Sequence, residues 1–360
     1  MHETVYKYFA CANSCRGFVD CFSSVLQGMN RVFILKGGPG TGKSTFMKGI
    51  GDHFAVFGET VEYIYCSSDP TSLDGIILRR RRIAVVDGTA PHVLEPTAPG
   101  ALEEYVNLGV AWEREKLTPY REEILELKSQ ISREYRELYR LLGEAKEIHD
   151  RWEKIYLENL DFANLDRAAE NLIDVILKEQ VPTGKVGTEV RRFFGALTPE
   201  GSVNYIEDLT RGLIQRYFIK GRPGTGKSTL MKKLAASARE CGLDVEVYPC
   251  SFDPESLDMV ILRQLGVCVF DATPPHELFP SRDTDVIVDL YAAAVAPGTD
   301  EANSEALSLL ATEYGRCVKG AKSHLARIHH LHNALEEYYI SAMGFNQIRQ
   351  MMEDLISEIE

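Results

Sequence analysis

Two nine-residue stretches carry the residue types that bind the phosphates of a nucleotide. Residues 37–45 read GGPGTGKST and residues 221–229 read GRPGTGKST, and both satisfy the P-loop pattern G-x-x-x-x-G-K-[ST]. In this pattern the glycines let backbone N–H groups turn toward phosphate oxygens, the lysine reaches the β- and γ-phosphates, and the Ser hydroxyl binds Mg²⁺. Two complete matches in one chain predict two sites for a nucleoside triphosphate.

The same roles are expected in both stretches. Lys43 and Lys227 would bind the β- and γ-phosphates, Ser44 and Ser228 would bind Mg²⁺, and the threonine that follows each serine would support the α-phosphate. The predicted nucleotide-binding residues are Gly37, Gly38, Pro39, Gly40, Thr41, Gly42, Lys43, Ser44 and Thr45 in the first stretch, and Gly221, Arg222, Pro223, Gly224, Thr225, Gly226, Lys227, Ser228 and Thr229 in the second. Arg222, which replaces a glycine, could contact phosphate or reach the other half of the chain.

An aspartate closes a later apolar run in each half. Asp87 follows residues 83–86 and Asp271 follows residues 267–270. This is the position of a Walker B aspartate, whose carboxylate holds Mg²⁺ at the C-terminal end of a strand. The next residue is Gly88 or Ala272, whereas many ATPases place there a glutamate that activates water. We therefore expect slow hydrolysis, or a base supplied from elsewhere in the chain.

A histidine lies five residues beyond each of these aspartates. His92 and His276 stand in the segments DGTAPH and DATPPH, on loops that should face the γ-phosphate. A histidine there could sense the phosphate or transfer a proton. A structural histidine, hydrogen-bonded within a Pro-rich turn, is the alternative.

Carboxylates follow the second predicted strand of each half, in a CS-x-DP-x-SLD segment. They are Asp69, Asp74, Asp253 and Asp258. P-loop kinases often bind their phosphate acceptor with a carboxylate in this region, whereas simple capping of the turn by Asp69 and Ser72 is the alternative.

Arginine and cysteine supply further candidates. Arg79 and Arg263 occupy equivalent positions, so each could contact phosphate as a charge-stabilising finger. Cys11, Cys15 and Cys21 form a C-x3-C-x5-C spacing that matches no standard zinc pattern.

The chain repeats itself over a whole unit, not only over the P-loop pattern. A shift of 184 residues aligns 31–96 with 215–280 without a gap, and 31 of the 66 positions are identical. Such self-similarity indicates a duplicated domain. Apolar runs at 32–35, 61–65 and 83–86, and at 216–219, 245–248 and 267–270, predict strands. A helix is expected over 43–57, and the segment CSSDPTSLDGIIL is expected to hold a loop and a short helix.

Strands that alternate with helices predict an α/β fold with two tandem P-loop NTPase-type units. Each unit would be a three-layer α/β/α sandwich around a parallel sheet, with an amphipathic helical appendage. Apolar residues spaced by threes and fours from Leu117 to Trp152 predict a long helix, with a break near Gly143. Residues 148–162 align with 331–345, so each half carries such an arm. The expected segments are a P-loop unit (1–109), a helical arm (110–180), a linker (181–189), a second P-loop unit (190–300) and a second arm (301–360).

Composition bounds the partners and the compartment. A formal net charge of −13 argues against nucleic-acid binding, because neutralising phosphates needs a basic surface. No apolar run approaches the roughly 20 residues that span a bilayer. Eight cysteines without a signal peptide fit a reducing, cytoplasmic location.

The two P-loops, the CSSDPTSLDG and DGTAPH segments and the paired arms resemble a family of uncharacterised bacterial tandem P-loop ATPases. The resemblance covers both units and implies ATP binding and hydrolysis. We therefore expect an ATP- and Mg²⁺-dependent protein with two sites, whose arms carry a conformational change to a protein partner. A small-molecule or nucleotide kinase, and a nucleotide-gated scaffold with little turnover, remain the alternatives.

Overall fold

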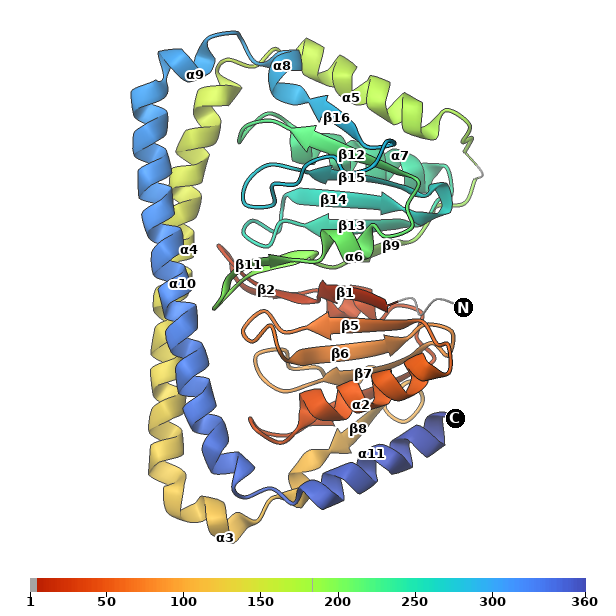
Figure 1. Ribbon diagram of the computed structural model, residues 1–360, viewed down its shortest axis with the longest axis vertical. Helices are drawn as coiled ribbons and strands as arrows, with labels where there is room; N and C mark the ends of the chain where they lie inside the picture. Colours follow the sequence, from red (N-terminus) through yellow and green to blue (C-terminus); the bar gives the residue numbers. More distant parts are fainter. Residues whose placement is uncertain (1–4, 183) are drawn as a thin grey trace.

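The protein consists of two α/β units that repeat one strand order (Figure 1). The computed structural model describes residues 5–182 and 184–360, so residues 1–4 of the first predicted unit and residue 183 of the predicted linker lie outside it. The first sheet contains, in spatial order, β1 (Val5–Phe9), β5 (Val61–Tyr65), β6 (Leu73–Leu78), β7 (Ile83–Asp87), β4 (Arg31–Lys36) and β8 (Glu103–Asn107). The second contains, in the matching order, β9 (Glu189–Arg191), β13 (Val245–Pro249), β14 (Leu257–Leu262), β15 (Val267–Asp271), β12 (Gln215–Lys220) and β16 (Val286–Asp289). All six apolar runs that predicted strands form strands.

One strand in each sheet runs against its neighbours. β6 is antiparallel to β5 and β7, β14 is antiparallel to β13 and β15, and the remaining pairings are parallel. The predictions of a wholly parallel sheet and of a short helix in CSSDPTSLDGIIL were therefore wrong. Residues 66–72 are too few for the crossover that a parallel connection requires, so the chain turns back. The apolar run Leu73–Leu78 then forms a strand that is buried along its whole length.

Long helices cover one face of each sheet. α2 (Lys43–Val56) and α7 (Lys227–Glu240) follow the two P-loop stretches and pack there. The other face is covered by short elements of both units, which share one apolar core: the hairpins β2 (Cys11–Ser14) with β3 (Gly17–Asp20) and β10 (Gly195–Thr198) with β11 (Gly201–Asn204), and the one-turn helices α1 (Phe22–Val25) and α6 (Ile206–Leu209). In the described residues the second helical layer of the predicted α/β/α units consists only of these short elements, because β6 and β14 are reached without crossover helices.

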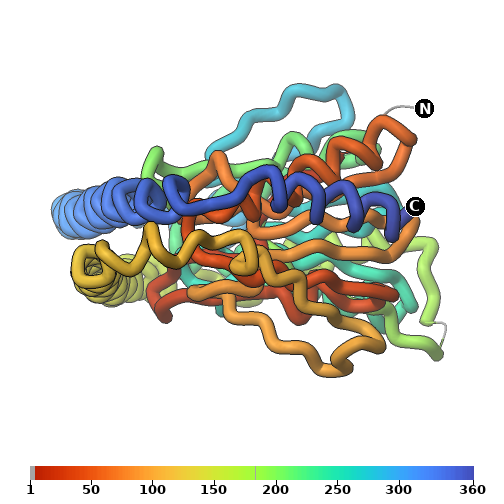
Figure 2. Tube along the Cα trace, turned by 90° about the horizontal axis from the view of Figure 1, so that it is seen from below, coloured from red at the N-terminus to blue at the C-terminus, as the bar shows by residue number. Residues whose placement is uncertain are grey.

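Two long helices lie side by side and pass both sheets (Figures 1 and 2). α4 (Arg121–Leu157) and α10 (Ser304–Ile340) have 37 residues each, which corresponds to about 55 Å. They run antiparallel and pack through buried residues that include Leu138, Leu142 and Leu325. The predicted break near Gly143 does not occur, because this packing outweighs the roughly 1 kcal/mol that one glycine costs a helix.

Each long helix ends on the opposite unit from the one at which it begins. α4 leads from the first unit to α5 (Phe162–Leu177), which packs on the second unit through Leu165 and Leu172. α10 leads from the second unit to α11 (Phe345–Ile359), which packs on the first through Ile348 and Leu355. The helical arms are thus exchanged between the units.

Short elements hold these crossings in place. Asp161 N–H donates to the Ala294 carbonyl (2.7 Å), and Glu113 N–H donates to the Ala342 carbonyl (2.8 Å). The short helices at the turns are α3 (Arg114–Leu117), α8 (Leu290–Ala294) and α9 (Thr299–Ala302).

None of the helices in residues 5–182 and 184–360 has both the length and the apolar character of a membrane span.

The two units meet at a pseudo-twofold axis between Phe9 and Phe193, which are equivalent under the shift of 184. Their backbones exchange two hydrogen bonds, of 2.9 and 2.8 Å. Beside them, the buried guanidinium of Arg192 lies 3.3 Å from Glu62 Oε2 and 2.9 Å from Glu246 Oε1. One cation therefore bridges equivalent carboxylates of the two units.

Two further arginines surround these carboxylates. Arg79 pairs with Glu62, and Arg263 Nε lies 2.7 Å from Glu246 Oε1. Burial alone would raise the pKa of Glu62 and of Glu246, but the guanidinium groups outweigh it and lower both pKa values. The junction between the units is thus a buried, charged cluster.

We expect Arg192→Ala to lower the free energy of unfolding by about 3–5 kcal/mol, because it leaves two carboxylates without their shared partner. Arg191→Ala is the matched control: this neighbouring side chain is exposed, and its loss should cost less than about 1 kcal/mol. Urea unfolding followed by fluorescence measures both. Equal effects of the two substitutions would contradict a central role for Arg192.

Stability should also fall in acid. Because the pKa values of Glu62 and Glu246 are lowered by folding, their contribution is complete above the unfolded pKa of about 4.3 and is lost as the pH falls below it toward the folded values. The free energy of unfolding, measured between pH 6 and pH 3 in wild type and Arg192→Ala, should decrease more steeply in wild type. Parallel curves would show that the cluster does not govern the acid response.

Candidate functional site

The P-loop stretches connect β4 to α2 and β12 to α7. Gly42 and Gly226 precede the two helices with φ of 82° and 80°, a left-handed conformation that favours glycine. The turn is closed inside by the side chain of Thr41, which donates to the Gly38 carbonyl (2.9 Å). Each stretch therefore brings backbone N–H groups of a first helical turn and the positive end of a helix dipole to one point.

A lysine and an aspartate approach each other at each of these points. Lys43 Nζ lies 3.5 Å from Asp87 Oδ2, and Lys227 Nζ lies 3.6 Å from Asp271 Oδ2. Each lysine also donates to a carbonyl of its own loop, at 2.8 Å for Gly38 and 2.9 Å for Arg222. The structure thus brings together the two charged groups that the sequence predicts for each site.

The serine of each stretch lies beside the neighbouring antiparallel strand. Ser44 Oγ accepts from Leu73 N–H (3.0 Å), and Ser228 Oγ accepts from Leu257 N–H (2.8 Å). Asp87 Oδ1 accepts from both the N–H and the hydroxyl of Thr89, so its other oxygen remains directed to Lys43. Serine hydroxyl and aspartate carboxylate are oxygen ligands of the kind that Mg²⁺ prefers. The threonines that follow, Thr45 and Thr229, are exposed in the first helical turn.

The two histidines are buried rather than open to solvent. His92 Nε2 lies 3.3 Å from Asp74 Oδ1, and His276 Nε2 lies 3.5 Å from Asp258 Oδ2. Burial lowers the pKa of His92, but Asp74 outweighs this effect and the pKa is raised. The sequence analysis named Asp74 and Asp258 as possible acceptor-binding residues, but it did not show that each of them pairs with a histidine.

Asp69 and Asp253, in the turns that precede β6 and β14, both accept from an N–H group of their own turn. Asp69 accepts from the N–H and hydroxyl of Thr71 and from the Ser72 hydroxyl, so it caps its own turn. Its counterpart Asp253 lies 3.5 Å from Lys146 of α4.

Each arginine that was predicted to contact phosphate pairs with a carboxylate of the protein. Arg79 and Arg263 pair with Glu62 and Glu246 at the junction between the units. They follow the C-terminal ends of β6 and β14, and these antiparallel strands begin beside the P-loops and run away from them. Arg222 pairs with Asp300 (2.8 Å) and stacks on Tyr291. Sequence spacing could not reveal these partners, which lie 17 to 78 residues away.

The arm of the other unit lies on each P-loop. In the first unit, Glu336 Oε1 of α10 accepts from Gly40 N–H (3.1 Å), and a β-carbon at Gly40 would meet the Glu336 carbonyl at 2.8 Å. In the second, a β-carbon at Gly224 would meet the Glu153 carbonyl of α4 at 2.9 Å. Glu153 and Glu336 are equivalent in the aligned arms.

A histidine precedes each of these glutamates by one helical turn. Burial lowers the pKa of His332 and of His149. Glu336 and Glu153, which lie 3.6 and 3.8 Å from the two imidazoles, oppose this effect, whereas Lys43 and Lys227 add to it, and both pKa values are lowered. Each P-loop lysine therefore has a histidine of the opposite arm within electrostatic reach.

Comparisons with known proteins are silent on this arrangement. No family model, curated protein or solved structure matches the chain.

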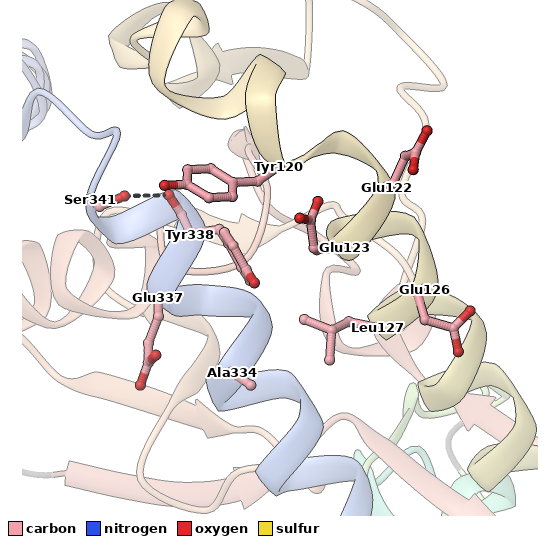
Figure 3. A pocket seen from close by; sticks show the side chains of 9 residues that line it. All are labelled: Tyr120, Glu122, Glu123, Glu126, Leu127, Ala334, Glu337, Tyr338 and Ser341. Carbon is pink, nitrogen blue, oxygen red and sulfur yellow. Dashed lines mark hydrogen bonds between the residues drawn. The ribbon is translucent and has the colours of Figure 1, made fainter.

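A groove on the helical pair lies apart from these residues. It runs between α4 and α10 near the first unit, where four glutamates and two tyrosines line much of it (Figure 3). The lining residues are Tyr120, Glu122, Glu123, Glu126, Leu127, Ala334, Glu337, Tyr338 and Ser341. None of them belongs to the predicted nucleotide-binding set.

Proposed function

We propose that this chain binds two molecules of ATP with Mg²⁺ and hydrolyses them at two P-loop NTPase-type sites. The observation that carries the proposal is that the lysine, serine and aspartate of each motif converge at the N-terminus of α2 and of α7, with nearly the same lysine–aspartate distance in both units. Helix N-termini with free amides bind phosphate, and a lysine adds a charge for the terminal phosphates.

The residues at each point fit a metal-bound triphosphate. Ser44 with Asp87, and Ser228 with Asp271, would hold Mg²⁺, which when bound neutralises charge between the β- and γ-phosphates. The loop has little spare room for side chains, since a β-carbon at Gly37 would meet Thr41 Oγ1 at 2.7 Å. A backbone this close to its own side chains suits direct contact with phosphate. No guanine-reading NKxD motif occurs in the sequence, which favours ATP.

The exchanged arms support coupling between nucleotide state and helix position. A phosphate bound at Gly40 N–H would compete with the Glu336 carboxylate that accepts there in the structure. Two anions cannot share one donor without repulsion, so nucleotide in the first unit would displace the end of α10. Since α10 starts in the second unit, the displacement would reach both units and any protein partner of the arms.

Hydrolysis without phosphate transfer is favoured over a kinase activity. Of the four carboxylates expected to bind an acceptor, Asp69 is occupied by its own turn, Asp253 faces Lys146, and Asp74 and Asp258 pair with the buried His92 and His276.

We also propose a cytoplasmic location, because the number and spacing of the eight cysteines fit a reducing compartment better than a disulfide framework.

Titration of ATP against the wild type should give two sites. Lys43→Ala and Lys227→Ala should each remove one, and the double variant should bind none, because each lysine serves a different loop. Isothermal titration calorimetry counts the sites and a phosphate-release assay measures turnover. Two sites retained in the double variant would refute nucleotide binding at the P-loops; two sites with no released phosphate would favour the nucleotide-gated scaffold.

Glu336→Gln should tighten ATP binding to the first site by about 3- to 10-fold, because it removes the charged competitor for Gly40 N–H. The comparison is made in Lys227→Ala, where only the first site remains, by measuring the dissociation constant. Glu337→Gln is the control, since this neighbour on α10 lines the groove instead. If ATP binding weakens, the carboxylate assists nucleotide binding and the competition is refuted.

A further inference from the structure

Neither unit has an acidic residue directly after its Walker B-type aspartate. Each unit does have a second carboxylate, Asp74 or Asp258, on the neighbouring strand at the same end of the sheet. The ladder between β6 and β7 ends with Gly75 opposite Val86, so Asp74 and Asp87 are the next residues at this end of the two strands. In the second unit the ladder ends with Met259 opposite Phe270, followed by Asp258 and Asp271.

A β-bulge sets the position of each second carboxylate. Tyr65 pairs with Leu73 and Ile64 pairs with Gly75, which leaves Asp74 as the extra residue of β6. Pro249 and Tyr248 pair with Leu257 and Met259, which leaves Asp258 in the same position. Bulges redirect a side chain out of the regular alternation and are frequent beside active sites.

These carboxylates lie close to the P-loop residues. Leu73, which precedes Asp74, donates its N–H to Ser44 Oγ, and Leu257 does the same for Ser228. The second carboxylate thus shares its surroundings with the proposed Mg²⁺ ligands.

The bonding of Asp74 is incomplete within the described residues. Its side chain is 4% exposed; one oxygen faces His92 Nε2, and Oδ2 has no hydrogen-bond partner in residues 5–182 and 184–360. An unsatisfied buried carboxylate oxygen is unfavourable, so this oxygen of the first unit needs an explanation. A donor that arrives with the substrate would satisfy it.

Cys11 also lies beside Asp74 and His92, and these three could hold a metal ion. The equivalent of Cys11 in the second unit is Gly195, whereas the aspartate–histidine pair is present in both units. The pair therefore has a task that does not need the thiol.

We infer that Asp74 and Asp258 orient the attacking water for ATP hydrolysis and accept its proton, and that His92 and His276 position them. This inference rests on the proposed function. The water oxygen forms the new bond to the γ-phosphorus, and the bond from that phosphorus to the β–γ bridging oxygen breaks with its electron pair leaving on ADP. The water proton passes to the carboxylate and is later released to solvent. Many ATPases have a glutamate directly after the Walker B aspartate. Here the carboxylate with that role thus comes from the adjacent antiparallel strand.

The test compares Asp74→Asn with Asp258→Asn, combined in one chain, against wild type. We expect kcat to fall about 100-fold or more, the range of a general base, while two ATP molecules still bind with dissociation constants within about 3-fold of wild type. Asp69→Asn with Asp253→Asn is the control from the same segments, and should keep kcat within about 3-fold. His92→Gln with His276→Gln should lower kcat by a smaller factor at unchanged KM, which a merely destabilised fold would not do.

The outcomes separate this inference from the proposed function. Unchanged kcat in the Asp74/Asp258 variant overturns the inference and leaves ATP hydrolysis in place. Loss of ATP or Mg²⁺ affinity in parallel with kcat also overturns it, because the carboxylates would then be ligands or structural groups. A wild type that binds two ATP molecules but releases no phosphate refutes the proposed hydrolysis itself, and the inference with it.

Discussion

The antiparallel packing of two helices of equal length fixes the geometry of the molecule. α4 and α10 have 37 residues each, and their shared apolar seam holds them in one register. Because they run in opposite directions, the end of each helix arrives at the unit from which the other starts. The distance between the two P-loops, and the residues that lie on each loop, follow from this register. A shift of one helical turn would move Glu336 about 5 Å from Gly40.

The pseudo-symmetry of the units is broken where they meet. Tyr8 and Arg192 are equivalent under the shift of 184, yet one is a phenol that donates to Glu62 and the other a guanidinium that reaches both Glu62 and Glu246. Two equivalent arginines on the axis would add a second buried positive charge next to the first. A single arginine between two carboxylates instead allows Arg79 and Arg263 to balance the outer sides. The duplicated sequence has therefore diverged at a place where perfect symmetry would be costly.

Local signals predicted the repeated parts of the fold well. The P-loop pattern, the strands at 32–35 and 83–86 and the helix from Lys43 depend on neighbours in the sequence, and the structure has each of them. The strand β6 was not predicted, because Pro70 suggested the first turn of a short helix, although residues 66–72 are too few for a crossover. The partners of Arg79, His92 and Gly40 could not be predicted, since pairings across strands and between distant helices leave no periodic trace.

Exchange of the arms also bears on the origin of the chain and on its minimal folded unit. In a half that ended after α5, the apolar face of that helix, including Leu165 and Leu172, would have no second unit to cover it. The same would hold for α11, whose Ile348 and Leu355 pack on the first unit. Two identical halves could satisfy both faces only by swapping their arms. The architecture is therefore similar to that of a domain-swapped homodimer joined into one polypeptide.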